Sequence, residues 1–98
     1  GGVFCEVDVT NDASVEAALA KARAAHGVER ILVNCAGIAP AKRTISKKRD
    51  TGELLAHDLG TFQKTVMVNL VGTFNMIAKS APANSYCANS AGSTQAMA

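Results

Sequence analysis

Arg30-Ile31-Leu32-Val33-Asn34-Cys35-Ala36-Gly37 has the pattern of a short buried strand that ends in a turn of small residues. Strands that are covered on both faces of a parallel sheet are nearly continuous apolar runs, and this one fits. Ligands of open α/β sheets bind just outside the carboxyl ends of the strands. We therefore expect a bound molecule at Asn34, Cys35, Ala36 and Gly37. A plain turn that needs Gly37 for its backbone angles explains the same residues about equally well.

An earlier segment, Val3-Phe4-Cys5-Glu6-Val7-Asp8, is a second strand candidate, because its residues suit a pleated and buried surface. Between the two strands, Ala13 to His26 predicts a helix. Its apolar residues recur at helical spacing, at Val15, Ala18, Leu19, Ala22 and Ala25. A strand, a crossover helix and a second strand imply parallel strands, so the fold class is α/β with a doubly wound parallel sheet.

Polar residues mark the ends of this first helix. Asn11 or Asp12 can cap its start, and Gly27 is the expected C-terminal cap. His26 is more consistent with a cation at the negative end of the helix dipole than with a catalytic base. Asp8 stands at the end of the first strand, where a turn or capping carboxylate is the ordinary interpretation.

The stretch from Ile38 to His57 predicts a long irregular loop that contains two basic clusters, Lys42-Arg43 and Lys47-Lys48-Arg49. These charges could bind a phosphate-bearing substrate. A solvated, flexible loop whose charges keep it soluble is the interpretation that the pattern favours. The loop lacks interleaved aromatic residues, so a nucleic-acid surface is not expected.

A second and longer helix is expected from Asp58, its N-cap, to about Lys79. Its apolar residues follow a helical stripe of Leu59, Phe62, Val66, Leu70, Thr73 and Ile77. Asn69 falls on this apolar face, where a buried amide needs partners from the backbone, a water or a reacting site. A structural Asn with satisfied hydrogen bonds is the more common case. Pro82 ends the helix, and the tail from Ala81 to Ala98 is expected to be loosely ordered.

Bulk properties exclude several classes of protein. The chain has 98 residues and a formal net charge of +2, which is too small to indicate nucleic acid or an acidic membrane surface as a partner. The three cysteines are far apart and match neither a disulfide framework nor a zinc site. This favours a reducing compartment, the cytoplasm, or the mitochondrial matrix if the source is eukaryotic. We expect no membrane span and no signal peptide.

Three motifs in this order resemble the short-chain dehydrogenase/reductase family. Asp8-Val9 resembles the pair that contacts adenine in this family. Asn34-Cys35-Ala36-Gly37 resembles the family's Asn-Asn-Ala-Gly motif. The helix that bears the family's catalytic asparagine is resembled by Val68-Asn69-Leu70 with Gly72 and Phe74. Three features together narrow the resemblance to the 3-hydroxyacyl-CoA dehydrogenase type-2 branch, which uses NAD: the run Asn34-Cys35-Ala36-Gly37-Ile38-Ala39, the basic inserted loop, and the run Asn69-Leu70-Val71-Gly72-Thr73-Phe74-Asn75. The resemblance implies a partial Rossmann-like sheet, with residues 1–80 as part of an NAD(P)-binding domain and residues 81–98 as an atypical tail.

The resemblance also implies roles for individual residues. Asp8 would accept a hydrogen bond from the adenine amino group, with Val9 beside the ring. The backbone at Cys35, Ala36 and Gly37 would lie along the riboses, and Asn34 would tie the strand end to its neighbours. Asn69 would be the catalytic residue that holds a water leading to the family's lysine.

Two family features have no counterpart in these residues: the glycine-rich turn that holds the pyrophosphate, and Tyr-x-x-x-Lys. Ser85-Tyr86-Cys87-Ala88-Asn89-Ser90 only echoes the latter, since Ser90 stands where the lysine belongs. Tyr86 also follows Asn69 too closely to leave room for another strand. We therefore expect the chain to be an incomplete fragment, inactive by itself.

The expected parent is an NAD-dependent oxidoreductase that moves hydride between NAD and a secondary alcohol or ketone, such as a 3-hydroxyacyl-CoA or a hydroxysteroid-like alcohol. The family's long helix, here Asp58–Lys79, implies a homo-oligomer. Two alternatives stay open. The chain could be a non-catalytic partner of an intact dehydrogenase, or a phospho-receiver-like module with Asp8 as acceptor, which lacks the clustered acidic residues that receivers need.

Overall fold

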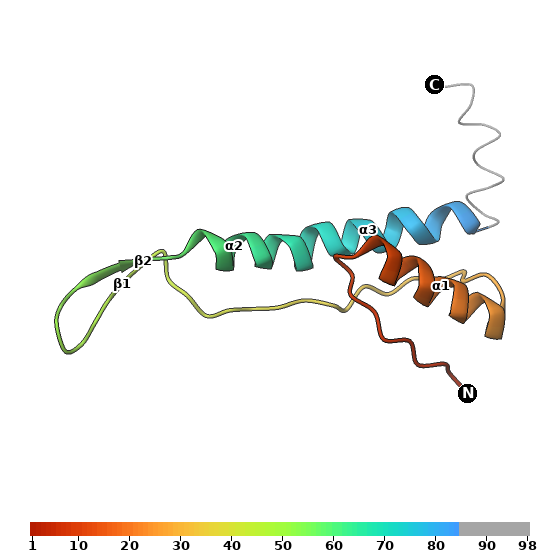
Figure 1. Cartoon of the computed structure of the whole chain (residues 1–98), viewed down its shortest axis with the longest axis horizontal. Helices are drawn as coiled ribbons and strands as arrows, with labels where there is room; N and C mark the ends of the chain where they lie inside the picture. The colour runs from red at the N-terminus through yellow and green to blue at the C-terminus, as the bar shows by residue number, and fades with distance from the viewer. Residues whose placement is uncertain (85–98) are drawn as a thin grey trace, which may run out of the picture.

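The computed structural model describes residues 1–84, and its framework is a pair of packed helices (Figure 1). Helix α1 spans Asp12–His26, and a long helix runs through α2 (Leu59–Val66), a π-helical turn (Met67–Val71) and α3 (Gly72–Ser80). A short 3₁₀ helix, Ala81–Ala83, follows. The chain leaves α1, turns back and runs alongside the long helix to a hairpin at the far end (Figure 1). Both expected helices are confirmed.

Local sequence signals explain where these helices begin and end. Asn11 is the N-cap of α1 and accepts a hydrogen bond from the backbone N–H of Ser14 at 3.0 Å. Gly27 has a φ of 80° and closes the helix by donating to the carbonyl of Arg23 at 2.8 Å. Asp58 caps α2 by accepting from the N–H of Thr61 at 2.8 Å. The predicted caps are therefore confirmed.

The expected parallel sheet does not form within residues 1–84, and this is a correction. Neither Val3–Asp8 nor Arg30–Asn34 is a strand, and no backbone–backbone hydrogen bond joins residues 2–7 or 28–37 to the rest of the described chain. The physical reason is that a strand needs a neighbouring strand to accept its hydrogen bonds, and within residues 1–84 neither segment has one.

A small antiparallel sheet occurs instead inside the basic loop, which was expected to be irregular. Strands β1 (Ile45–Lys47) and β2 (Leu54–Ala56) pair with Ser46 opposite Leu55. Gly52 takes a φ of 73° in the connecting turn, and its N–H donates to the carbonyl of Lys48 at 3.0 Å. Turn chemistry that only glycine adopts easily therefore overrides the expectation of an irregular loop.

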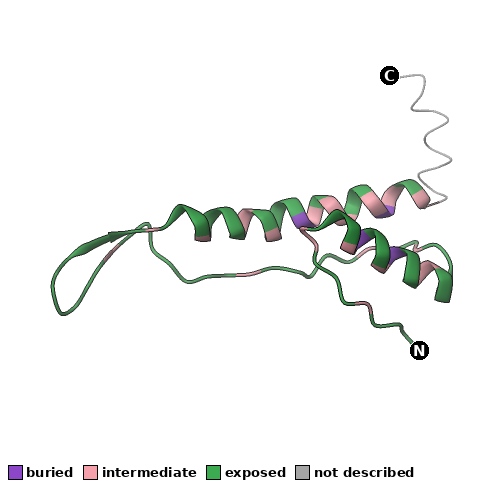
Figure 2. Ribbon diagram, in the orientation of Figure 1, coloured by how far each residue is buried: buried purple, intermediate pink, exposed green. Residues whose placement is uncertain are grey.

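The core is very small, as the burial colours of Figure 2 show. Val15 and Leu19 of α1 are its buried apolar side chains among the described residues, and they lie where α1 packs on α3. Phe4, Ile31 and Val33 are 82%, 83% and 74% exposed. The Cα radius of gyration is 19.3 Å, against about 13 Å for a compact domain of this length. The structure therefore has the open form expected of part of a domain.

A polar network links the C-terminal ends of α1 and α3. The guanidinium of Arg23 donates to both carboxylate oxygens of Glu29 at 2.9 and 2.6 Å, and the buried hydroxyl of Ser80 donates to the same carboxylate at 2.7 Å. These bonds, chiefly those from Arg23, lower the pKa of Glu29 to about 2. The network ties both helices to the segment that follows α1.

Glu29 makes this contact sensitive to acid. Because its pKa is lowered from 4.5 to about 2, its stabilisation is fully present above pH 4.5 and is lost as the pH falls through 2. We expect the free energy of unfolding, followed by helical circular dichroism, to drop by about 1–2 kcal/mol over this range. Glu29→Gln should reduce the drop, whereas Glu53→Gln, a change in an exposed ion pair, should leave it as in the wild type. A flat wild-type profile would contradict the prediction.

Candidate functional site

Asn69 lies in the π-helical turn of the long helix and binds the backbone of a distant loop. Its side-chain oxygen accepts from the N–H of Ile38 at 2.8 Å, and its NH₂ donates to the carbonyl of Ile38 at 2.8 Å. Asn69 is exposed rather than buried, which corrects the expectation from the apolar stripe. Of the partners that the sequence left open, the structure selects backbone groups. Single π turns inside α-helices are frequent at functional sites.

The predicted ligand loop Asn34–Gly37 stands directly before this contact. A Cβ on Gly37 would lie 3.3 Å from the side-chain oxygen of Asn69, so a larger residue would push the amide aside. Asn34, Cys35, Ala36 and Gly37 are all exposed, and their backbone groups make no hydrogen bond to any other residue in the range 1–84. Free N–H and C=O groups on a short, small-residue loop are suited to bind a ligand edge-on.

Asp8 occupies a tight turn before α1. One carboxylate oxygen, Oδ1, accepts from the backbone N–H and the hydroxyl of Thr10 at 2.9 and 2.7 Å. These bonds lower the pKa of Asp8, so the carboxylate is ionised at neutral pH and can only accept hydrogen bonds. The second oxygen, Oδ2, has no hydrogen-bond partner among the described residues. The ordinary interpretation as a turn carboxylate is thus confirmed, and one oxygen remains for a ligand.

The same helix holds both loops. The side-chain NH₂ of Asn75 donates to the carbonyl of Val9 at 3.0 Å, and the buried Gly72 faces the side chain of Val9. Val9 and Ile38 are therefore attached to one helix, at positions six residues apart. Sequence reasoning gave no role to Asn75, and the signal that could have found it is the spacing of three between Asn69, Gly72 and Asn75.

Other expected site residues are not brought into this arrangement. Asn34 makes no side-chain hydrogen bond within residues 1–84, so its tie to neighbouring strands stays a prediction. Tyr86 and Ser90 lie outside the described residues. Within the described part of the chain, no group of three His, Cys, Asp or Glu residues could hold a metal ion, and no helix has the length and apolar character to cross a bilayer.

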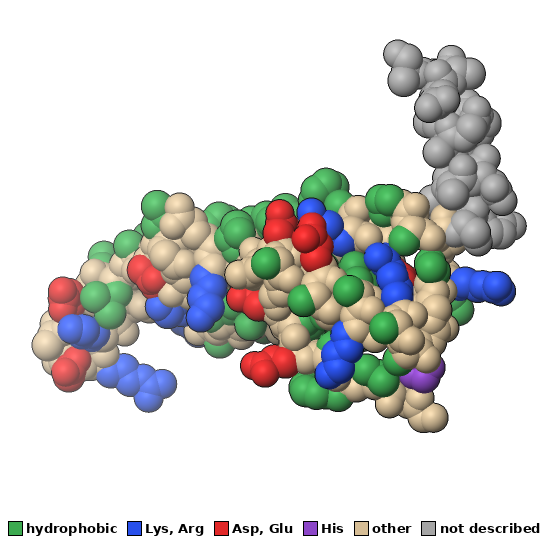
Figure 3. Space-filling view, turned by 45° about the vertical axis from the view of Figure 1, so that its right-hand side comes forward, with side chains coloured by type: hydrophobic (Ala, Val, Ile, Leu, Met, Phe, Trp, Pro, Cys, Tyr) green, Lys and Arg blue, Asp and Glu red, His purple; other side chains and the backbone are tan. Residues whose placement is uncertain are grey.

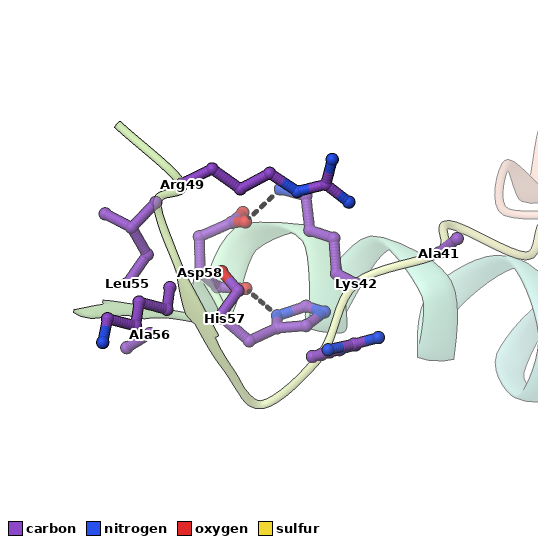
Figure 4. A pocket seen from close by; sticks show the side chains of 10 residues that line it. Ala41, Lys42, Arg49, Leu55, Ala56, His57 and Asp58 are labelled. Atoms are coloured by element: carbon purple, nitrogen blue, oxygen red, sulfur yellow. Dashed lines mark hydrogen bonds and ion pairs between the residues drawn. The ribbon is translucent and has the colours of Figure 1, made fainter. Parts of the chain in front are cut away.

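The basic clusters form a second feature, an open pocket of about 450 Å³ beside the hairpin (Figure 4). Lys42 forms an ion pair with Asp58, which lowers the pKa of that carboxyl well below its usual range. His57 Nδ1 lies 2.8 Å from the carbonyl of Asp58 and therefore donates to it, which leaves Nε2 free.

Three further cations line the pocket: Arg43, Lys47 and Arg49. None of the three has a carboxylate partner within residues 1–84. Figure 3 shows acidic as well as basic side chains at this end of the molecule. The excess of unpaired positive charge makes the pocket suitable for an anion.

Comparison with known proteins shows the family to which the chain belongs. The profile of the family described as enoyl-(acyl carrier protein) reductase matches residues 1–98. This chain belongs to the short-chain dehydrogenase/reductase family. It is 46% identical over 74 residues to 3-hydroxyacyl-CoA dehydrogenase type-2 of Bos taurus, which covers 76% of this chain and 27% of the bovine protein.

Two further relatives carry the same name. The Homo sapiens protein is 44% identical over 75 residues, covering 76% of this chain and 27% of its own length. The Drosophila melanogaster protein is 43% identical over 79 residues, covering 81% and 29%. The chain thus spans less than a third of the length of these short-chain dehydrogenase/reductase relatives. Family and branch resemblance are both confirmed, and with the family comes a Rossmann-like α/β fold.

Proposed function

We propose that this chain forms part of the NAD site of an oxidoreductase, whose whole protein moves hydride between NAD and a secondary alcohol or ketone such as a 3-hydroxyacyl-CoA. The observation that carries the proposal is the joint placement of two loops on one helix. Within residues 1–84, Asp8–Val9 offers a free carboxylate oxygen, and Asn34–Gly37 offers unpaired backbone groups. When bound, NAD would supply the hydride acceptor.

The residues present fit the adenosine part of this cofactor. An adenine amino group is a donor, and Oδ2 of the ionised Asp8 is an acceptor without a partner in the described chain. The small side chains of Cys35, Ala36 and Gly37 would let the riboses approach the backbone. Family resemblance supports the choice of NAD, since relatives in this branch are dehydrogenases by name.

Asn69 keeps hydrogen-bonding capacity for a second task. A side-chain amide has two N–H donors and two acceptor lone pairs, and Ile38 uses one of each. The remaining N–H and lone pair support the role that the family resemblance implies, which is to hold a water on the proton path. In this proposal, Ile38 fixes the orientation of the amide so that the unused pair points in one direction.

Binding of AMP to the purified chain tests the adenine assignment. We expect Asp8→Asn to weaken AMP by about tenfold, because the amide cannot serve both Thr10 and adenine as acceptor. Asp50→Asn, a change at an exposed turn carboxylate, should leave AMP affinity as it is. We also expect no NADH formation from 3-hydroxyacyl-CoA, since the 98 residues contain no glycine-rich turn and no Tyr-x-x-x-Lys. Equal AMP affinity of Asp8→Asn and wild type would refute the assignment.

The basic pocket supports an acyl-CoA rather than an uncharged hydroxysteroid-like alcohol as the substrate. Coenzyme A carries several phosphates, and the unpaired Arg43, Lys47 and Arg49 offer them charge-assisted hydrogen bonds. The neutral alcohol would make no use of these cations.

Coenzyme A and pantetheine, which lacks the nucleotide phosphates, provide the comparison for this substrate class. We expect the chain to bind coenzyme A but not pantetheine, and the double change Lys47→Gln and Arg49→Gln to weaken coenzyme A by about tenfold. Lys64→Gln, which removes one positive charge outside the pocket, is the control for Lys47→Gln and Arg49→Gln made singly. Similar affinity for the two ligands, or an equal loss in the control, would exclude the phosphate site.

A second candidate function is that of a non-catalytic partner of an intact dehydrogenase. The long helix favours it, because Leu70, Phe74 and Ile77 recur at helical spacing and are 67%, 68% and 48% exposed. Phe62 and Leu59, about two and three turns before Leu70, are also exposed. A face of this kind commonly packs against another helix. It supports both a homo-oligomer of the parent and association of this chain with complete subunits.

Sedimentation velocity tests whether the chain associates through this helix face. We expect the chain to self-associate, and to co-sediment with a full-length 3-hydroxyacyl-CoA dehydrogenase type-2, through this helix face. Phe74→Asp should abolish both associations, because it places a charge among apolar side chains. Ala24→Asp, on the exposed side of α1, should leave both intact. A monomer that does not bind the full-length enzyme would dismiss this candidate.

A further inference from the structure

The contact between Val9 and α3 is closer than ordinary helix packing. A Cβ built on Gly72 would lie 2.4 Å from Cγ2 of Val9 and 3.1 Å from its Cβ. Since real side chains do not approach this closely, any residue larger than glycine must push Val9 away from the helix. Gly72 is itself buried, so Val9 fits directly against the helix backbone.

Asn75 holds the same residue from its backbone side. Its side-chain NH₂ donates to the carbonyl of Val9 at 3.0 Å, and both residues are half-buried. Val9 is therefore fixed twice, by packing at its side chain and by a hydrogen bond at its carbonyl. Asp8, its neighbour, has no hydrogen bond to the long helix within residues 1–84, where it bonds to Thr10, Asn11 and Ser14.

We propose that Gly72 and Asn75 are positioning residues, which set where the Asp8 carboxylate stands by holding Val9 against α3. The inference rests on the proposed NAD site and adds the two residues that locate its adenine wall. Asn69 holds the other wall through Ile38, six residues earlier on the same helix, a rise of about 9 Å. One helix therefore fixes the spacing between the two parts of the site.

This arrangement predicts that changes in the long helix weaken the two parts of the cofactor site separately, whereas a general loss of structure would weaken both. The adenine ring of the cofactor depends on Val9 and hence on Asn75, whereas its riboses depend on the loop that ends at Ile38 and hence on Asn69. A change at Asn75 should therefore displace Val9 and Asp8 but leave the loop at Ile38 in place. A merely structural role would weaken both parts together.

Titrations with AMP and with nicotinamide mononucleotide, on the full 98-residue chain, test the proposal. We expect Asn75→Ala to weaken AMP by about fivefold to tenfold and nicotinamide mononucleotide by less than about twofold. Gly72→Ala should show the same selectivity, because it displaces the same residue. Asn69→Ala should weaken nicotinamide mononucleotide at least as much as AMP. Equal losses of both ligands in Asn75→Ala, or no loss of AMP, would overturn the proposal.

Amide hydrogen exchange tests the positioning role independently of the proposed NAD site. If the wild-type chain binds neither ligand, the proposed NAD site fails on its own. The positioning role is then decided by the amide of Asn11, which donates to the carbonyl of Asp8 at 3.0 Å. Faster exchange of Asn11 in Asn75→Ala, with Ile38 unchanged, supports the positioning role, and unchanged exchange of Asn11 refutes it.

Discussion

Two side-chain amides of one helix carry the tertiary arrangement of this chain. Asn69 binds both polar backbone groups of Ile38, and Asn75 binds the carbonyl of Val9. With so few buried apolar side chains, these hydrogen bonds and the Arg23–Glu29–Ser80 network take over the task that a larger core performs in a complete domain. The geometry of the candidate site thus follows from the helix, and hardly at all from the segments that lead up to the site.

The helices could be predicted from the sequence because their signals are local. Asn11, Gly27 and Asp58 cap elements whose apolar residues recur at helical spacing, and each signal acts within a few residues of the backbone it fixes. Asn69 was found by its odd placement on an apolar stripe. Its partner Ile38, 31 residues away, could not be derived from that placement, since the contact depends on how the loop returns.

The strands show the opposite case. Residues 3–8 and 30–34 have the composition of buried strands, yet a strand exists only when another strand accepts its hydrogen bonds. The composition of a segment indicates that it suits a strand in a complete sheet. Whether the strand forms depends on the hydrogen-bond partners that are present. The hairpin was missed for a related reason, because its pairing depends on Gly52 and on a three-residue ladder too short to leave a pattern. Asn75 was overlooked because a half-buried polar residue on a helix is common.

The uncovered apolar residues Phe4, Ile31 and Val33 also bear on the life of this polypeptide in a cell. Unpaired strand segments of this kind are templates on which other chains add, and they are the surfaces that chaperones and proteases recognise. A chain that leaves these segments uncovered is therefore open to quality control, and covering them would protect it.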